Sequence, residues 1–448
     1  MQVKSNDERT AVKRKINDIL DAGSFMEVGE HVSARFTEFY QPDSVVESDG
    51  VVTGYGTVGG NLVFVYAQDG EVMGGTFGEQ HGRKIVNLYD KAIKAGAPII
   101  GLLDCAGFRI EEGLGGLDQF AKLYSRQAEA AGVIPQIAAV IGQCGGGMSI
   151  AAEQADFVFV EKDKGSLFVN PKGVLDNDIG DNANLAPVDD GCYEWAEIAA
   201  KIKKLVEMLP GNADIFAPID DVSDDDLNRV CDGIDAKLGD AKAILADLAD
   251  DGEVLEIQPE LGRDMVAGFI KLAGETVGVA ACNAVDGEKR ITAEGCDKAA
   301  NLVDICSRFD IPVLTVTDTE GYQTTSTNER YLPASAGRLV RALADADVPK
   351  FNLITGKVVG SAYSLLNPKG LGADYVFMWD SAVASIVNSR QAIEVLYGNW
   401  SQELEDKFKE GQSSALALAR HGLADKVIAP EESRKYLIGA LQTFVNSR

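Results

Sequence analysis

The feature that most constrains the fold of this chain is an internal repeat. Residues 51–67, VVTGYGTVGGNLVFVYA, are matched by residues 265–281, MVAGFIKLAGETVGVAA, with Gly54 aligned to Gly268, so the spacing is 268 − 54 = 214 residues. The same spacing relates further pairs along the chain: Asp104 and Asp318, Gly107 and Gly321, Phe108 and Tyr322, Pro135 and Pro349, and Gly146 and Gly360. This constant spacing predicts two homologous domains, 1–208 and 251–448, joined by an acidic helical connector at 209–250.

Each half shows an alternation of strands and helices. In the first half, two extended runs at 50–57 and 61–66 flank a glycine pair, which indicates a β-hairpin. An amphipathic helix is expected at 82–96, because its apolar residues recur at helical spacing. Apolar runs at 98–103 and 136–141 indicate buried strands. This alternation predicts an α/β fold with a mostly parallel sheet in each half.

A glycine-rich turn follows the last of these strands. In the stretch IPQIAAVIGQCGGGMSIAAEQADFVFV, Gly145, Gly146 and Gly147 separate a predicted strand from a short predicted helix. The first N–H groups of a helix lack intrahelical partners, and glycine has no Cβ to keep a ligand away from them. Such a place is typical of a site for an oxyanion, whether a phosphate, a carboxylate or an enolate. A tight turn that serves packing alone fits the same residues.

The second half carries a matching turn, Gly360-Ser361-Ala362, at the equivalent place. If the first turn holds an oxyanion, the second is expected to hold one too. Two such sites suit an enzyme that stabilises two enolate-like anions. The alternative is a duplication kept for reasons of fold, with the glycines needed only for packing.

Composition narrows the classes of function. The net charge of −27 argues against nucleic acid as a partner. No apolar run is long enough for a transmembrane helix, and MQVKSNDERTAVKRK lacks the apolar core of a signal peptide. Seven cysteines without a CxxC pair predict reduced thiols in a cytoplasmic protein, with Cys144 a packing residue in preference to a nucleophile. Three scattered histidines give no basis for a metal site.

On these motifs the chain resembles the carboxyltransferase subunits of biotin-dependent acyl-CoA carboxylases and decarboxylases, such as propionyl-CoA carboxylase β subunits and the α subunits of glutaconyl-CoA and methylmalonyl-CoA decarboxylases. The resemblance is carried by SDGVVTGYGTVGGNLVFVYAQD, VMGGTFGEQHGRKIVNLYDKAIKAGAPIIGLLDCAGFRIEEG and QCGGGMSIAAEQADFVFV. In the second half, VTDTEGY and TGKVVGSAYSLLNPKGLGADYVFMW extend it more weakly, so that it covers nearly the whole chain.

The resemblance implies tandem crotonase-like domains, each a spiral of ββα units. Domain 1–208 would hold a CoA thioester and domain 251–448 would hold biotin. Because the chain lacks an AMKM-type attachment motif, biotin is expected on a separate biotin carboxyl carrier protein. The domains of different subunits are expected to meet, which implies a homodimer or a larger homo-oligomer. A biotin carboxylase and a membrane decarboxylase subunit are further partners that the family allows.

The resemblance also implies roles for single residues. The amides of Gly146 and Gly147 would hold the thioester enolate, and those of Ser361 and Ala362, after Gly360, would hold the biotin enolate. The residues implied along the CoA are Ala106, Gly107, Phe108, Arg109 and Gly145. Those implied near biotin are Gly321 and Tyr322. The chemistry needs no side-chain base, because the biotin enolate left by loss of CO2 can take the α-proton of the thioester; the protein supplies N–H donors and orientation.

The chain departs from the family pattern at three places. The segment 169–184 is shortened, EGYQTTSTNER replaces PGFLPGTxQE, and Phe108 stands where the family has alanine. These departures leave the acyl group and the use of biotin open.

Other functions fit some of the same residues. A biotin-independent hydratase, isomerase or decarboxylase of the crotonase type would need a carboxylate base, for which Glu111, Glu112 or Glu153 is available. A serine peptidase related to ClpP would use Ser149 with His81. A catalytically degenerate scaffold subunit is the non-enzymatic alternative.

Overall fold

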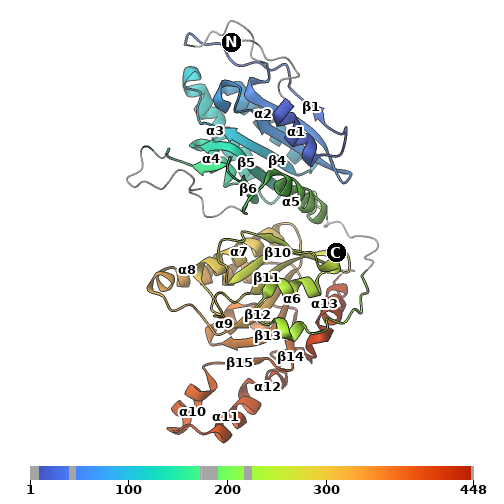
Figure 1. Cartoon of the computed structure of the whole chain (residues 1–448), viewed down its shortest axis with the longest axis vertical. Helices are drawn as coiled ribbons and strands as arrows, with labels where there is room; N and C mark the ends of the chain where they lie inside the picture. Colours follow the sequence, from blue (N-terminus) through green and yellow to red (C-terminus); the bar gives the residue numbers. More distant parts are fainter. Residues whose placement is uncertain (1–9, 40–46, 172, 174–189, 216–224, 445–448) are drawn as a thin grey trace. The chain divides into compact units, whose positions relative to one another are not determined.

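The computed structural model describes residues 10–39, 47–171, 173, 190–215 and 225–444. The chain forms two compact units, Met1–Ile215 (unit 1) and Phe216–Arg448 (unit 2) (Figure 1). Most of the shortened segment 169–184, from residue 174 onward, lies outside the described residues.

Unit 1 is built on a sheet with the strand order β1-β2-β3-β4-β5-β6-β8, in which β7 also pairs with β5. Strands β2 and β3 form the expected antiparallel hairpin, and β3 to β6 run parallel. The strands are β1 (Met26–Glu27), β2 (Val51–Val58), β3 (Asn61–Gln68), β4 (Ile99–Cys105), β5 (Gln136–Gly145), β6 (Phe157–Glu161), β7 (Ser166–Phe168) and β8 (Cys192–Tyr193). The α-helices are α1 (Thr10–Ile19), α2 (Glu79–Ala95), α3 (Leu114–Ala130), α4 (Gly147–Ala152) and α5 (Trp195–Met208), with 3-10 turns η1 (Ser48–Gly50), η2 (Met73–Gly75) and η3 (Ile110–Glu112).

Helix α2 shows why this sequence folds as it does. Its apolar residues Ile85, Leu88 and Tyr89 recur at helical spacing and are all buried. The helix ends at Gly96, whose left-handed conformation (φ 61°, ψ 50°) lets its N–H cap the last turn. Helices α2 and α3 pack together on one face of the sheet, while α1 and α5 pack together on the other, so the core lies on both faces of β3 to β6.

Unit 2 repeats this plan. Its sheet has the order β9-β10-β11-β12-β13-β14-β16, and β15 pairs with β13 as β7 does with β5. The strands are β9 (Leu255–Ile257), β10 (Met265–Leu272), β11 (Glu275–Cys282), β12 (Val313–Thr319), β13 (Lys350–Val359), β14 (Tyr375–Trp379), β15 (Val383–Ser385) and β16 (Lys426–Ile428). The helices are α6 (Ala241–Leu248), α7 (Ala293–Arg308), α8 (Ser326–Asp345), α9 (Ser361–Leu365), α10 (Ser389–Tyr397), α11 (Gln402–Phe408), α12 (Ala415–Arg420) and α13 (Ser433–Gln442), with short turns η5 (Ile234–Lys237), η6 (Asp250–Gly252), η7 (Lys369–Leu371), η8 (Lys409–Ser413) and η9 (Pro430–Glu432).

The expected α/β architecture with equivalent halves is confirmed, and the two sheets share even their register shift. β2 and β10 begin at equivalent residues, since 265 − 51 = 214, and the register of both sheets shifts at the same place, between Leu103 and Cys105 and between Thr317 and Thr319. The spacing grows to 375 − 157 = 218 at β6 and β14, because unit 2 has the extra turn η7 between α9 and β14.

The stretch expected as a connector contains the first helix of unit 2. Apolar residues at positions 241, 244, 245 and 248 put one buried face on α6, which packs into the same core as α13. This apolar stripe, which is helical in period, lies within a stretch that is otherwise densely acidic. Helix α6 therefore corresponds to α1, and α13 to α5.

All seven cysteines are free thiols, as expected for reduced cysteines. Within the described ranges, no helix combines the length and the apolar character that crossing a bilayer would need.

A buried arginine ties α13 to the segment around α6. Arg434 is fully buried; it donates to the Leu248 carbonyl at 2.6 Å and pairs with the Asp250 carboxylate at 2.6 Å. Arg434→Met should lower the free energy of unfolding of unit 2 by about 3–5 kcal/mol, because it leaves a buried carboxylate without its counter-ion. The shift can be measured by urea unfolding followed through the fluorescence of Trp379, whose ring N–H donates to Ser433 at 2.7 Å, in a background with Trp195 and Trp400 replaced by Phe.

Lys435→Met is the matched control, since Lys435 is the next residue of α13 and its side chain is half exposed. It should change stability little. Equal, small shifts for both variants would show that the buried pair does not anchor this segment.

Candidate functional site

Each unit has one strand-to-helix turn of the same geometry. Gly146 (φ 60°) joins β5 to α4, and Gly360 (φ 67°) joins β13 to α9. The N–H of Gly146 donates to the Phe168 carbonyl of β7 at 2.9 Å, and the N–H of Gly360 donates to the Ser385 carbonyl of β15 at 2.8 Å. A short third strand thus fixes the turn in both units, and the positive φ explains why glycine stands there.

The next two N–H groups of each turn differ from the first. Within the described residues, no group accepts a hydrogen bond from the N–H of Gly147 or Met148, nor from the equivalent Ser361 and Ala362. The amide of Gly146, expected to hold an enolate, is instead engaged with β7. The pair in unit 1 that matches Ser361 and Ala362 is Gly147 and Met148, since 362 − 214 = 148.

The neighbouring strand supplies a second wall in each unit. The segment after β4 contains Gly107 (φ 118°), and the segment after β12 contains Gly321 (φ 111°). The residue after each glycine forms a β-bridge at an equivalent place, Phe108 with Phe77 and Tyr322 with Ile291. A Cβ on Gly107, Gly321 or Gly146 would meet no atom of the described residues within 4 Å, so among these residues nothing covers the three backbones.

Some predicted site residues do come together. The Tyr322 hydroxyl lies 3.3 Å from the Ser361 hydroxyl, which joins two residues expected near biotin. Phe108 is partly exposed beside Ala106 and packs edge-on against Phe120, with ring centroids 4.7 Å apart. Gly145 has a packing role, because a Cβ there would lie 2.9 Å from the Phe168 ring.

The side chain of Arg109, a residue expected along the CoA, is held inside the fold. Its side chain is buried and pairs with the carboxylates of Asp49 and of Glu112, the latter at 2.7 Å. Its other donors bond to the Thr76 carbonyl at 2.7 Å and hydroxyl at 3.2 Å. Because these partners engage the guanidinium inside the fold, the side chain of Arg109 is not available to a ligand.

The Ser149–His81 pair of a peptidase is not formed. His81 is fully buried, with Nδ1 2.9 Å from the Asp49 carbonyl and Nε2 3.1 Å from the Gln68 amide nitrogen. Since the Gln68 amide oxygen accepts from the N–H of Asp104 at 3.2 Å, this amide donates to His81. The Ser149 hydroxyl donates to the Gly146 carbonyl at 2.7 Å. Both groups therefore hold the fold together.

The buried His81 should make stability depend on pH. Burial, helped by the charge of Arg109, lowers the pKa of His81 from 6.5 to about 3. Between these values the unfolded chain binds a proton that the folded chain does not, so stability falls as pH falls from 6.5 toward 3. His81→Gln should remove up to about 1.4 kcal/mol per pH unit of this slope, measured by urea unfolding at a series of pH values.

Burial also raises the pKa of Asp49 to about 6, which stabilises the folded chain below that pH and so has the opposite sign. The difference between wild type and His81→Gln isolates the histidine. His31→Gln is the control, because the side chain of His31 is 79% exposed. An unchanged slope in His81→Gln would contradict this account.

The remaining candidate side chains are placed as follows. Glu112 is buried, and its carboxylate also accepts from the N–H of Glu79 at 2.5 Å, whereas Glu111 and Glu153 are exposed. Burial raises the pKa of the Cys144 thiol well above its usual value, which keeps it protonated and fits a packing residue. Among the residues that the structure places, no group of three or more metal-ligating side chains gathers.

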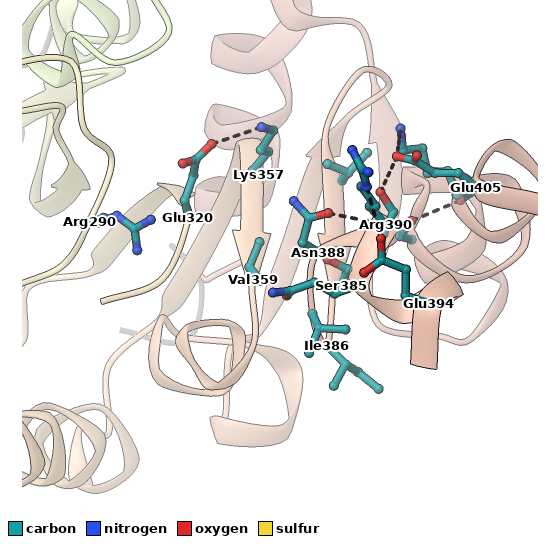
Figure 2. Close-up of a pocket in the computed structure, with 16 residues that line it drawn as sticks. Arg290, Glu320, Lys357, Val359, Ser385, Ile386, Asn388, Arg390, Glu394 and Glu405 are labelled. Atoms are coloured by element: carbon teal, nitrogen blue, oxygen red, sulfur yellow. Dashed lines mark hydrogen bonds and ion pairs between the residues drawn. The ribbon is translucent and has the colours of Figure 1, made fainter. Parts of the chain in front are cut away.

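A cavity of about 810 Å³ adjoins the turn of unit 2 (Figure 2). Its wall near the turn is formed by Val359, Ser385 and Ile386, and its charged lining includes Arg290 and Lys357, which the sequence analysis did not single out. A position-by-position comparison of the two repeats could have found both, because the equivalent residues Thr76 and Gln143 are uncharged.

The comparisons with known proteins agree with this geometry. A model of the carboxyl transferase domain matches residues 2–189 and 194–448. The propionyl-CoA carboxylase beta chain of Cereibacter sphaeroides is 32% identical over 98% of this chain and 91% of its own length. The methylmalonyl-CoA carboxyltransferase 12S subunit of Propionibacterium freudenreichii subsp. shermanii is 30% identical over 99% and 90%. A transcarboxylase 12S crystal structure, described as a hexamer with hydrolysed methylmalonyl-coenzyme A bound, superposes with a TM-score of 0.91 at 27% identity, covering 99% of this chain and 92% of the other.

The chain belongs to the carboxyl transferase domain family. The expected tandem crotonase-like fold is confirmed. The protein is an enzyme, a carboxyltransferase that acts between an acyl-CoA and biotin carried on a separate protein, as the resemblance implied.

Proposed function

We propose that unit 1 holds the acyl-CoA, that unit 2 holds biotin, and that the acyl group is short, as in propionyl-CoA and methylmalonyl-CoA. The observation that carries the proposal is the duplicated turn. In each unit the first amide is tied to a short strand, and the next two donate to no group of the described residues. Carboxyl transfer develops negative charge on two oxygens, one on each substrate, and each turn offers preorganised donors for one of them.

The balance of the reaction shows what each turn must do. In transfer to the acyl-CoA, the bond from biotin nitrogen to the carboxyl carbon breaks, the α-carbon loses a proton and gains that carbon, and the proton ends on biotin. Gly147 and Met148 would hold the thioester oxygen while it carries charge. Ser361 and Ala362 would do the same for the ureido oxygen. The open surface at Gly146 and Gly321 gives both ligands access.

The short acyl group is supported by the relatives and by one side chain. The relatives include proteins named for propionyl-CoA and methylmalonyl-CoA, among them the methylmalonyl-CoA decarboxylase subunit alpha of Veillonella parvula, 29% identical over 98% of this chain. Phe108 presents a large ring at the wall of the unit 1 site, which would leave little room for a long acyl chain.

We further propose that the chain acts as a homo-oligomer, with unit 1 of one subunit facing unit 2 of another, and that a biotin carrier protein docks on it. Large apolar side chains support this assembly. Ile110 and Leu114 in unit 1 are 87% and 80% exposed, and Ile386 and Val395 in unit 2 are 88% and 83% exposed. Exposed apolar side chains mark an interaction surface where they form a contiguous patch, as neighbours on one helical turn can.

The direct test is transfer of a labelled carboxyl group from methylmalonyl-CoA to biotinamide by the purified chain. Biotinamide is chosen because its neutral side chain resembles the amide link to a carrier. The proposal predicts label on biotinamide and loss of transfer when avidin is added. Release of CO2 at the same rate without biotinamide would favour the biotin-independent crotonase-type reaction, and no reaction with either substrate would favour a scaffold.

A further inference from the structure

The two repeats differ in charge beside their turns. Positions 289, 290 and 357 are Lys, Arg and Lys in unit 2, whereas the residues 214 positions earlier are Gly75, Thr76 and Gln143. The alignment here is structural, because the equivalent bridges Phe77–Phe108 and Ile291–Tyr322 lie next to these positions. Two carboxylates, Glu288 and Glu320, accompany the three cations, where unit 1 has Gly74 and Ala106. Unit 2 therefore has a charged rim beside its turn, one charge more positive than the equivalent positions of unit 1.

Within this rim, two of the cations are already neutralised. The ammonium of Lys289 lies 2.5 Å from the Asp318 carboxylate, and that of Lys357 lies 3.0 Å from the Glu320 carboxylate. Arg290 has a looser partner, with its Nε 3.7 Å from Glu288, whose side chain is 72% exposed. Its Nη1 donates to the Tyr322 carbonyl at 3.3 Å. An exposed pair of this kind contributes little, and a guanidinium has five N–H donors, so Arg290 keeps donors for a ligand.

Arg290 also lies in the right place. It lines the cavity beside the turn, on the same side as Glu320 and Lys357 and across from Arg390 and Glu405 (Figure 2). The facing cations are paired, Arg390 with Glu394 at 3.3 Å and Lys409 with Glu405 at 2.8 Å. Arg290 contacts Tyr322, and the hydroxyl of Tyr322 lies beside the hydroxyl of Ser361 in the glycine turn.

We propose that Arg290 binds the carboxylate of carboxylated biotin, so that the unit 2 site distinguishes the carboxylated carrier from the uncarboxylated one. This inference rests on the proposed assignment of biotin to unit 2. The planar fork of a guanidinium matches a carboxylate with two parallel hydrogen bonds. Uncarboxylated biotin presents a neutral ureido ring and offers Arg290 no such partner. In unit 1 the equivalent residue is the uncharged Thr76, whose hydroxyl accepts from Arg109 inside the fold.

The test compares two ligands that differ only by the carboxyl group. Biotinamide binding is measured by equilibrium dialysis, and chemically carboxylated biotinamide is followed through its decarboxylation. In Arg290→Gln, the KM for carboxylated biotinamide should rise by about 10-fold or more, as expected for loss of a charge-assisted contact. The affinity for biotinamide should change by less than about two-fold, since the lost contact is absent there. Arg290→Lys should lie between wild type and Arg290→Gln, because it keeps the charge without the fork.

Arg338→Gln is the matched control in the same unit, because Arg338 is 62% exposed and pairs with Asp297 on α7, outside the cavity. It should leave both ligands unaffected. If Arg290→Gln weakens the binding of both ligands equally, or of neither, the proposed role of Arg290 is wrong. The assignment of biotin to unit 2 is not affected by that result. A wild-type chain that does not bind biotinamide would overturn the assignment of biotin to unit 2 and this inference with it, so the two failures are distinguishable.

Discussion

Replacing Gly147 by proline is expected to slow exchange of the α-proton of a bound acyl-CoA by about 100-fold or more, the usual cost of one oxyanion donor. Only proline removes a backbone N–H, and Gly147 is the first residue of α4, the helix position that tolerates proline best. Decarboxylation of carboxylated biotinamide should proceed at the wild-type rate, because it depends on the turn of unit 2. Both rates can be measured on the same preparation, the first by uptake of deuterium from solvent.

Gly147→Ala is the control that this position requires. A Cβ on Gly147 would lie 2.9 Å from the Tyr124 hydroxyl and 3.2 Å from the Phe120 ring, so both substitutions strain the same contacts. Only the proline variant loses the N–H. If the two variants, both folded by circular dichroism, lose exchange equally, then Gly147 is a packing residue and the oxyanion role is wrong.

Replacing Ser361 by proline should give the reverse pattern. Ser361 is the first residue of α9 and is exposed, so proline there removes an N–H with little disturbance of the core. Decarboxylation of carboxylated biotinamide should fall by about 100-fold or more, and α-proton exchange should remain.

Ser361→Ala provides the comparison, since it removes the hydroxyl that meets Tyr322 but keeps the N–H. A loss in Ser361→Ala as large as in Ser361→Pro would assign the effect to the hydroxyl. Loss of both half-reactions in either proline variant would mean that the two turns work as one site.

The features that sequence alone could predict are those that a repeat or a local periodicity displays directly. The spacing of 214 residues located both turns, and the structure gives both the same glycine with positive φ and the same tie to a third strand. The hairpin at 51–68 and helix α2 follow from alternation and from helical spacing of apolar residues. The hairpin and the helix are each predicted from the residues of a single segment, and the turns from the match between the two repeats.

What sequence could not predict depends on contacts between distant segments. The resemblance implied that Arg109 lies along the CoA, but Asp49, 60 residues away, pairs with its guanidinium inside the fold. A distant contact also engages the N–H of Gly146, which donates to the Phe168 carbonyl of β7. No local pattern indicates this hydrogen bond. The apolar stripe of α6 lies within the acidic stretch 209–250, and its packing partner α13 lies at the far end of the chain.

The central claim is that carboxyl transfer needs both turns and that they come from two different subunits. Co-expression of Gly147→Pro and Ser361→Pro with two different tags, followed by purification through both tags, gives oligomers that contain both variants. If a site combines unit 1 of one subunit with unit 2 of another, roughly half of the sites in a mixed dimer carry neither substitution. Transfer from methylmalonyl-CoA to biotinamide should then recover to a substantial part of the wild-type rate. Mixed oligomers as inactive as either variant alone would contradict the claim.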